Sequence, residues 1–431
     1  MAKRRYSLAV LLGVALAVRV AWVLAQPADA DAIDRLPDQR EYLRLGQNLL
    51  HGHGLKFFDP RFRAEVYAFR TPGYPLLVAA CGGEARAVRL AQALLDTSTV
   101  LAVFLLARRW LARGPSLFAA ALVAFNPFLI YFTGLVLTET VFTAMLAWGM
   151  VLLLGPSRPA SDSDSEAGAG TTWPATLVWL AGGLLLALSV LVRQSAAGLP
   201  LVLAVGAAFV NRGRGAPYHR RWPLPVGATM LLLTVLVLLP WAHRNRRVLG
   251  EWVWTTTNGG ITLYDGLNPD ATGASDQSFV QSMPELRGMD ELARSRHLSD
   301  LATEFVRRQP LRAAELAVEK ARRTWSPVPL SQEYGGWKYR TVGLLYSLPL
   351  DVLVIVGLFR SPRRGGALAL SVKVFLLLPA IYFTAVHMLS VGSLRYRIPV
   401  EPPMAVIAAS AAVLPGVGGW KRAERDDTQA G

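Results

Sequence analysis

About ten stretches of roughly 20 apolar residues run along this chain, and they limit its fold more than any other feature. Because hydrocarbon offers the backbone no hydrogen-bond partners, each stretch is expected to form a helix. The 431 residues are 52% hydrophobic and 17% charged, against about 25% charged in ordinary soluble domains. We therefore predict an all-α polytopic membrane protein, with spans near 7–25, 86–107, 115–132, 137–155, 174–192, 195–210, 223–241, 341–359, 366–386 and 399–415.

The basic residues predict which loops face the cytoplasm. The net charge of +15 would suggest nucleic acid in a soluble protein, but here much of the excess lies in short loops between spans, so no nucleic-acid partner is expected. The positive-inside rule assigns such loops to the cytoplasm. We predict a multi-pass protein of the plasma (inner) membrane with both termini cytoplasmic. The basic residues concerned are Arg108, Arg109, Arg113, Arg212, Arg214, Arg220, Arg221, Arg360, Arg363, Arg364, Lys421, Arg422 and Arg425.

The first span has an alternative interpretation. Lys3, Arg4 and Arg5 precede the apolar run, and Ala28-Asp29-Ala30 resembles a signal-peptide cleavage site. The run from about 8 to 25 is longer than the usual apolar region of a signal peptide, of roughly 7–15 residues. A retained span is therefore favoured over a cleaved one.

Three regions follow from this topology. Residues 1–241 form a transmembrane region that includes a first outer loop at 26–84. Residues 242–339 form a second outer segment, and residues 340–431 form a C-terminal transmembrane region with a short cytoplasmic tail. Long outer loops on a rigid scaffold are where sites are usually built.

Two parts of these outer segments are expected to be helical, and one inner connection is not. Apolar residues fall on one side of the stretch 40–50, which predicts an amphipathic helix at the interface. A similar pattern over 289–325, broken at Pro310, predicts two surface helices. The Ser- and Asp-rich segment 156–172 is predicted to be a flexible linker, and it lacks the basic excess of the other inner loops. No internal repeat of the kind found in many transporters is evident.

Two motifs lie in the first outer loop. Asp38-Gln39-Arg40-Glu41-Tyr42 follows the first span, and Arg70-Thr71-Pro72-Gly73-Tyr74-Pro75 closes the loop. They resemble the GT-C superfamily of membrane glycosyltransferases, in the branch that holds protein O-mannosyltransferases, lipid A aminoarabinose transferases and rhizobial lipopolysaccharide transferases. Further similar segments are Leu137-Thr138-Glu139-Thr140, Leu239-Pro240-Trp241 with Arg244, Asn245 and Gly250, Thr257-Asn258-Gly259-Gly260 with Gly266 and Asn268, and Arg395-Tyr396-Arg397 with Pro399.

The resemblance implies a GT-C fold and an activity. The expected reaction transfers a sugar, with inversion, from a polyprenyl-phosphate carrier to a lipid, glycan or protein acceptor on the outer face of the membrane. Asp38 and Tyr42 stand where the family has an acid and a tyrosine. The chain departs from the aminoarabinose transferases at Gln39 and Glu41, where those proteins carry Glu and Arg.

Such a transfer needs a base for the acceptor hydroxyl and cations for the departing phosphate. We predict Asp38 as the base, with Glu139 as a second acid of the site. Asp31 and Asp34 share the loop and are alternative bases, and Asp38 and Glu139 could instead be helix caps. The predicted phosphate ligands are arginines near outer helix ends, together with one charge inside the first span: Arg70, Arg244, Arg395, Arg397 and Arg19.

Cofactors and rival functions are less constrained. No organic cofactor is implied, and a divalent metal ion is left open. His243, or His51 with His53, could be metal ligands, although lone histidines are more often structural; Cys81 is the one cysteine. A transporter or flippase of lipid-linked saccharides would instead favour charges spread through the spans. A polymerase or ligase using a diphosphate-linked glycan is a further alternative.

One intramembrane ion pair is also predicted. Asp351 lies nine residues before Arg360, and Lys373 lies nine residues after Arg364, so both sit at one depth on neighbouring antiparallel helices. An unpaired charge there costs about 2.5–3.5 kcal/mol on insertion scales. An Asp351–Lys373 pair is therefore expected, the alternative being an inward-snorkelling lysine.

Overall fold

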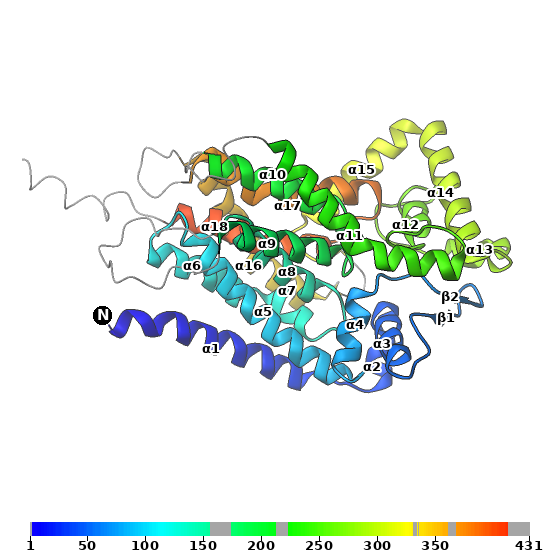
Figure 1. Ribbon diagram of the computed structural model, residues 1–431, viewed down its shortest axis with the longest axis horizontal. Coiled ribbons are helices and arrows are strands. Elements are labelled where there is room, and N and C mark those ends of the chain that lie inside the picture. Colours follow the sequence, from blue (N-terminus) through cyan, green and yellow to red (C-terminus); the bar gives the residue numbers. More distant parts are fainter. Residues whose placement is uncertain are drawn as a thin grey trace, which may run out of the picture.

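The computed structural model describes residues 2–155, 174–212, 223–330, 334, 336–360 and 368–412, and its regular structure is almost entirely helical (Figure 1). The predicted all-α membrane fold is confirmed, with a helix in each predicted span. The predicted linker at 156–172 lies outside the described residues. The span helices are α1 (Ala2–Ala25), α5 (Ala85–Ala107), α6 (Arg113–Ala124), α7 (Pro127–Thr133), α8 (Glu139–Leu153), α9 (Ala175–Val190), α10 (Leu199–Arg212), α11 (Pro223–Leu249), α16 (Trp337–Phe359), α17 (Leu370–Leu389) and α18 (Glu401–Ala411).

The lengths of these helices correct the sequence expectation. Among the described residues, six helices are long and apolar enough to cross a membrane, and α6 with α7 forms a pair bent by 50°. Pro127 cannot donate a backbone hydrogen bond, and Asn126 accepts from Phe128 N at 2.9 Å, so the chain starts a new helix there. Helices α8 and α9 have 15 and 16 residues and α18 has 11. Each is shorter than the span predicted for it, at 137–155, 174–192 and 399–415.

The two segments that the sequence predicts to face outward, the outer segments, gather at one end of the helix bundle, opposite the N-terminal end of α1 (Figure 1). Helices α14 and α15 meet at Pro310, as predicted. The first segment contains α2 (Ala30–Asp34), α3 (Pro37–Leu50), β1 (Phe57–Asp59), β2 (Ala64–Val66) and α4 (Gly73–Ala80). The second contains α12 (Gly259–Gly266), α13 (Phe279–Ser282), η2 (Pro284–Arg287), α14 (Glu291–Arg308) and α15 (Pro310–Thr324). Short 3-10 turns are η1 (Gln194–Ala196), η5 (Leu394–Tyr396) and η6 (Ile398–Val400).

Helix α3 confirms the amphipathic helix predicted at 40–50. It buries Tyr42 and Leu45, which are 6% and 3% exposed. Gly46 lies directly against α4, where a Cβ would clash with Val78, so glycine permits this close approach. The strands β1 and β2 pair antiparallel in the same segment. This packing fixes the first turn of α3 beside the residues that precede α4.

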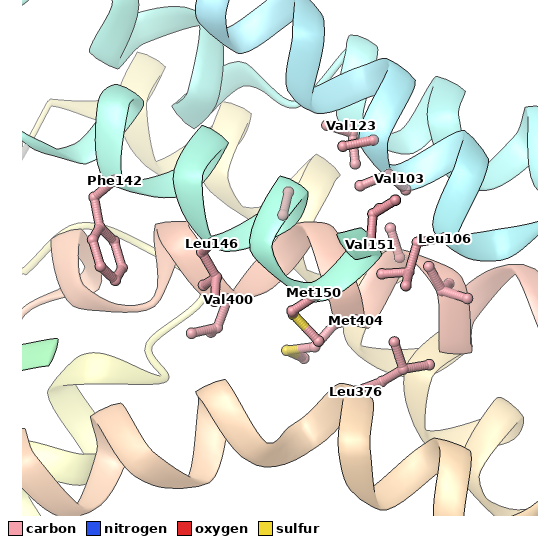
Figure 2. Close-up of a cluster of buried hydrophobic side chains, with 14 of the residues drawn as sticks. Val103, Leu106, Val123, Phe142, Leu146, Met150, Val151, Leu376, Val400 and Met404 are labelled. Atoms are coloured by element: carbon pink, nitrogen blue, oxygen red, sulfur yellow. The ribbon is translucent and has the colours of Figure 1, made fainter. Parts of the chain in front are cut away.

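The bundle core is formed by side chains from α5, α6, α8, α17 and α18 (Figure 2). Leu146, Met150, Leu376 and Met404 are each no more than 4% exposed. Lipid tails are as apolar as these side chains, so moving the side chains from lipid into the bundle excludes little water. Their burial therefore stabilises the bundle mainly through close packing. The tight core gives the outer segments a rigid base.

The Asp351–Lys373 prediction is wrong. Asp351 Oδ1 lies 3.2 Å from Arg397 Nη2, while Lys373 Nζ donates to the carbonyls of Leu358 and Arg360, both at 2.8 Å. The last carbonyls of a helix have no partner within it, so the end of α16 accepts from the lysine. Asp351 therefore pairs with Arg397, which precedes α18, and not with Lys373.

Helix α1 is tied into the bundle by a fully buried ion pair. Arg19 Nε lies 2.5 Å from Asp96 Oδ2 on α5, and both side chains are 0% exposed. Arg19 Nη1 also donates to Ala124 O at 2.9 Å. Cleavage after Ala30 would remove this arginine and leave Asp96 without its cation, which supports a retained first span.

Helix α15, in the second outer segment, carries a buried lysine that makes stability depend on pH. Lys320 donates to Met388 O at 3.3 Å, and burial, partly offset by the charge of Asp265, lowers its pKa to about 8. An unfolded lysine has a pKa of about 10.4. Between these values the unfolded chain binds more protons than the folded one, so stability should rise with pH across this window as the folded lysine deprotonates.

We therefore expect Lys320→Met to raise the unfolding temperature at pH 7. The gain should shrink as the pH approaches 10, because the neutral amine no longer opposes burial. Thermal unfolding in detergent at both pH values, wild type against variant, measures this. An equal shift at both pH values would contradict the role of the charge.

Candidate active site

A cavity of about 1560 Å³ opens where the outer segments meet the bundle. Its walls come from parts of the chain that are distant in sequence: the start of α3, the residues before α4, helix α7, the η1 turn, the 256–277 stretch, the end of α15 with the start of α16, and the residues around η5. The acidic, basic and histidine lining residues are Asp38, Glu41, Arg61, Arg70, Arg193, Asp265, Asp276, Arg323, Lys338, His387 and Arg395.

Asp38 lies between two arginines in this cavity. Its Oδ1 is 2.5 Å from Arg70 Nη2, and its Oδ2 is 2.8 Å from Arg395 Nη1. The N-cap residue of α3 is Leu36, with no side-chain cap, so Asp38 does not cap the helix. Both oxygens of this first-turn carboxylate instead face the cations. The structure thus brings together three residues that the sequence proposed for the site.

Glu139 lies directly behind these arginines. It is 0% exposed in the first turn of α8, and one oxygen accepts from Arg395 Nε. The same oxygen lies 3.4 Å from Nη2 of Arg193, which precedes η1. Since Glu139 is not among the cavity-lining residues, its carboxylate holds the two arginines from behind.

Glu41 completes the cluster on the other side. Its Oε2 is 2.5 Å from Arg70 Nη2, and its Oε1 is 3.3 Å from Nη2 of Arg61, which also pairs with Asp59 at 2.7 Å. The Arg70 guanidinium lies over the ring of Tyr42, 5.2 Å from the ring centre, in a cation–π contact. The spacing from 38 to 41 places both acids on one helix face, a signal that could have found Glu41. Arg61 had no such signal, whereas Arg193 lies at the outer end of the predicted span 174–192 and could have been found by that position.

The pKa values of the cluster's two acids on α3 are shifted in opposite directions. Burial alone would raise the pKa of Asp38, but the charges of Arg70 and Arg395 hold it well below its usual value. Burial raises the pKa of Glu41, and the charge of Asp38 adds to this, although Arg70 opposes it. Asp38 is therefore ionised at neutral pH, and Glu41 is the more easily protonated neighbour.

Three predicted phosphate ligands lie away from this cluster and do not line the cavity as described. Arg244 donates to the carbonyls of Tyr67 and Leu55, at 2.7 and 2.8 Å, and so holds the first outer loop. Arg397 is 0% exposed and lies 2.8 Å from Glu401 as well as near Asp351. Arg19 is paired with Asp96 as above. Their contacts are structural ones.

The alternative bases and metal ligands are also placed. Asp34 is half-exposed in α2, with Arg40 at 4.0 Å, and Asp31 is exposed; neither lines the cavity. His51 Nδ1 lies 2.8 Å from Gln47 O, and the His243 ring lies 6.2 Å from that of Trp252. The part of the chain that the structure describes has no group of three or more His, Cys, Asp or Glu able to hold a metal ion.

Solved structures with a similar fold include an oligosaccharyltransferase of Archaeoglobus fulgidus. Its complex with an inhibitory peptide and a dolichol-phosphate matches with a TM-score of 0.54 at 14% identity, covering 94% of this chain and 50% of that one. Its form tethered to an acceptor peptide matches with a TM-score of 0.53 at 16% identity, covering 94% and 49%. This chain has a GT-C fold. It spans about half the length of these oligosaccharyltransferases.

ArnT from Cupriavidus metallidurans, bound to undecaprenyl phosphate, matches with a TM-score of 0.38 at 14% identity, covering 94% of this chain and 77% of that chain. No protein-family model matches the sequence. No curated protein matches it significantly. The fold and the apolar helices together make this a multi-pass membrane protein.

Proposed function

We propose that this protein transfers a sugar from a polyprenyl-phosphate carrier to a lipid, glycan or protein acceptor on the outer face of the membrane. The supporting observation is the carboxylate of Asp38, set between Arg70 and Arg395 in a cavity at the outer-segment end of the bundle. A lipid-linked donor keeps its tail in the bilayer and its phosphate at the interface, where this cluster of cations would meet it. The GT-C fold agrees with the proposal.

In the proposed reaction the acceptor oxygen attacks the anomeric carbon of the donor sugar. The new glycosidic bond forms as the bond from that carbon to the phosphate oxygen breaks, and the acceptor proton passes to Asp38. The departing phosphate takes the electron pair of the broken bond. Arg70 and Arg395 stabilise the charge that grows on it, and a preorganised guanidinium suits this through paired N–H donors. Attack opposite the phosphate inverts the anomeric carbon.

The same arginines would couple donor binding to the base. An aspartate with both oxygens on guanidinium groups is a weak base, because those charges keep its pKa low. A donor phosphate competes for Arg70 and Arg395, and each contact it takes releases a carboxylate oxygen. Asp38 then becomes more basic at the moment when the leaving group is in place. Glu139, behind the wall, keeps Arg395 and Arg193 oriented during this exchange.

A flippase of lipid-linked saccharides is the alternative from another class of protein. Such a protein is expected to carry charged residues within its membrane spans. Such charges are present, since Arg19 pairs with Asp96 and Arg397 pairs with Glu401. These pairs are closed within the bundle and away from the cavity lining, which favours the transferase. Incubating the purified protein in vesicles with labelled polyprenyl-phosphate sugars distinguishes the two. Released polyprenyl phosphate supports the transferase, and intact donor moved across the bilayer supports the flippase.

Arg70→Ala should raise the apparent donor constant and lower turnover, because it removes a cation that binds the phosphate more tightly as the charge grows. Loss of a charged hydrogen bond predicts a decrease in kcat/KM of about 10- to 100-fold. Steady-state transfer with varied donor measures this. The control is Arg296→Ala, which breaks an exposed pair with Glu251 in the same outer region and should leave both constants unchanged. An effect of Arg70→Ala on acceptor affinity alone would remove the leaving-group role.

A further inference from the structure

One wall of the cavity carries four buried polar atoms that have no hydrogen-bond partner among the described residues. They are Arg193 Nη1, Ser195 Oγ, Asn258 Oδ1 and His387 Nε2, and all four residues line the cavity. Arg193, Asn258 and His387 are 9%, 9% and 5% exposed. Native proteins leave few buried polar groups unpaired, because each one costs free energy. With Arg323 Nε, five such atoms belong to residues that line this one cavity, which indicates a polar ligand.

These residues are held next to one another by contacts across the wall. The His387 ring stacks on Tyr396 with 3.6 Å between ring centres, and the Arg193 guanidinium lies 5.5 Å from the same tyrosine ring. Tyr382, five residues before His387 on α17, donates to Ser195 O at 3.0 Å and so joins α17 to η1. The hydroxyl of Thr256 bonds the side chain of Gln194, which brings the 256–258 stretch to the same turn.

The hydrogen-bonding character of the four atoms identifies the ligand class. The guanidinium nitrogen of Arg193 only donates, the amide oxygen of Asn258 only accepts, and the hydroxyl of Ser195 does both. A phosphate has no donor for Asn258 when fully ionised, and an apolar chain satisfies none of them. A ring bearing several hydroxyl groups can donate and accept at neighbouring positions. Sugar hydroxyls therefore fit this set.

The wall also lies where the sugar of the donor must be. Arg193 connects it to the phosphate cluster, because its Nη2 shares the Glu139 oxygen that also accepts from Arg395. A sugar linked to a phosphate held by Arg70 and Arg395 would extend directly onto this surface. Resting on the proposed function, we infer that Arg193, Ser195, Asn258 and His387 form the subsite that binds the sugar ring of the lipid-linked donor.

The test compares lipid binding with and without a sugar. The probes are undecaprenyl phosphate and its glucose, mannose, galactose and arabinose esters, measured separately on the full-length protein in detergent. Ser195→Ala and His387→Phe each remove one unpaired polar group, and phenylalanine can keep the stack on Tyr396. Each variant should weaken the best-bound sugar ester by about 3- to 10-fold and leave undecaprenyl phosphate unchanged. The matched control is Ser347→Ala, which removes a buried unpaired hydroxyl outside the cavity lining and should change neither.

The outcomes separate the subsite from the proposed function. Equal losses of affinity for bare and sugar-bearing lipid, or no loss of affinity in either variant, would overturn the subsite without contradicting the role of the phosphate cluster. The subsite would also be overturned if the wild type bound none of the four sugar esters more tightly than undecaprenyl phosphate. Selective loss in both variants, without release of polyprenyl phosphate on incubation with acceptors, would keep the sugar subsite and overturn the transferase.

Discussion

Asp38→Asn is expected to lower the rate of sugar transfer by roughly 100- to 10,000-fold, the usual contribution of a general base. Asparagine keeps the size of the side chain and can still accept from Arg70 or Arg395, so the fold should persist. It cannot take the acceptor proton. Donor binding should be kept, because the variant removes an anion that competes with the phosphate for both arginines. Turnover and donor binding, measured on the same preparation, test the two parts separately.

Asp34→Asn is the matched control for this prediction. Asp34 lies in the same outer loop but is half-exposed and away from the cavity lining, so its variant should transfer at nearly the wild-type rate. An active Asp38→Asn beside an inactive Asp34→Asn would refute the assignment. Glu41 provides a second comparison, since burial raises its pKa. A larger loss in Glu41→Gln than in Asp38→Asn would move the role of base to Glu41.

The part of the candidate site that lies in recognisable sequence motifs could be predicted. Asp38, Arg70, Glu139 and Arg395 each lie at the end of a predicted helix or in the first outer loop, and the structure brings all four together. Their shared position follows from topology, because the ends of alternating spans meet on one side of a membrane. Arg193 was missed, although it lies immediately before η1 in the short connection between the predicted spans 174–192 and 195–210. The predicted topology puts this connection on the outer side, so an arginine at the outer end of a span was the signal that could have found it.

Sequence failed where pairing depended on tertiary detail. Depth along the helices placed Asp351 level with Lys373, but depth does not fix which faces of α16 and α17 meet. Arg397 reached Asp351 because η5 and η6 set it into the bundle before α18 begins. From sequence alone Arg19 is a candidate ligand, because an isolated intramembrane charge suggests function. Its partner Asp96, 77 positions further along the chain, turns that charge into a structural contact.

Removing one member of the Arg19–Asp96 pair should destabilise the protein severely. Both side chains are 0% exposed, with Arg19 Nε 2.5 Å from Asp96 Oδ2, and the guanidinium also donates to backbone carbonyls of α1 and α6. Breaking a buried pair leaves one charge uncompensated and costs about 3–5 kcal/mol. We therefore expect Arg19→Met and Asp96→Leu each to lower the unfolding temperature strongly in detergent. Arg312→Ala, which breaks an exposed pair with Glu315 on α15, should have little effect.

The double variant separates structure from function. With both charges replaced by apolar side chains of similar size, the pair's desolvation cost disappears, and most of the lost stability should return. Because the two residues touch, the single losses should not add, and the double-mutant cycle measures their coupling. The double variant should also transfer sugar at nearly the wild-type rate, since Arg19 lies away from the cavity lining. A stable double variant without activity would instead give Arg19 a direct part in catalysis, and additive losses would show that the two charges do not stabilise each other.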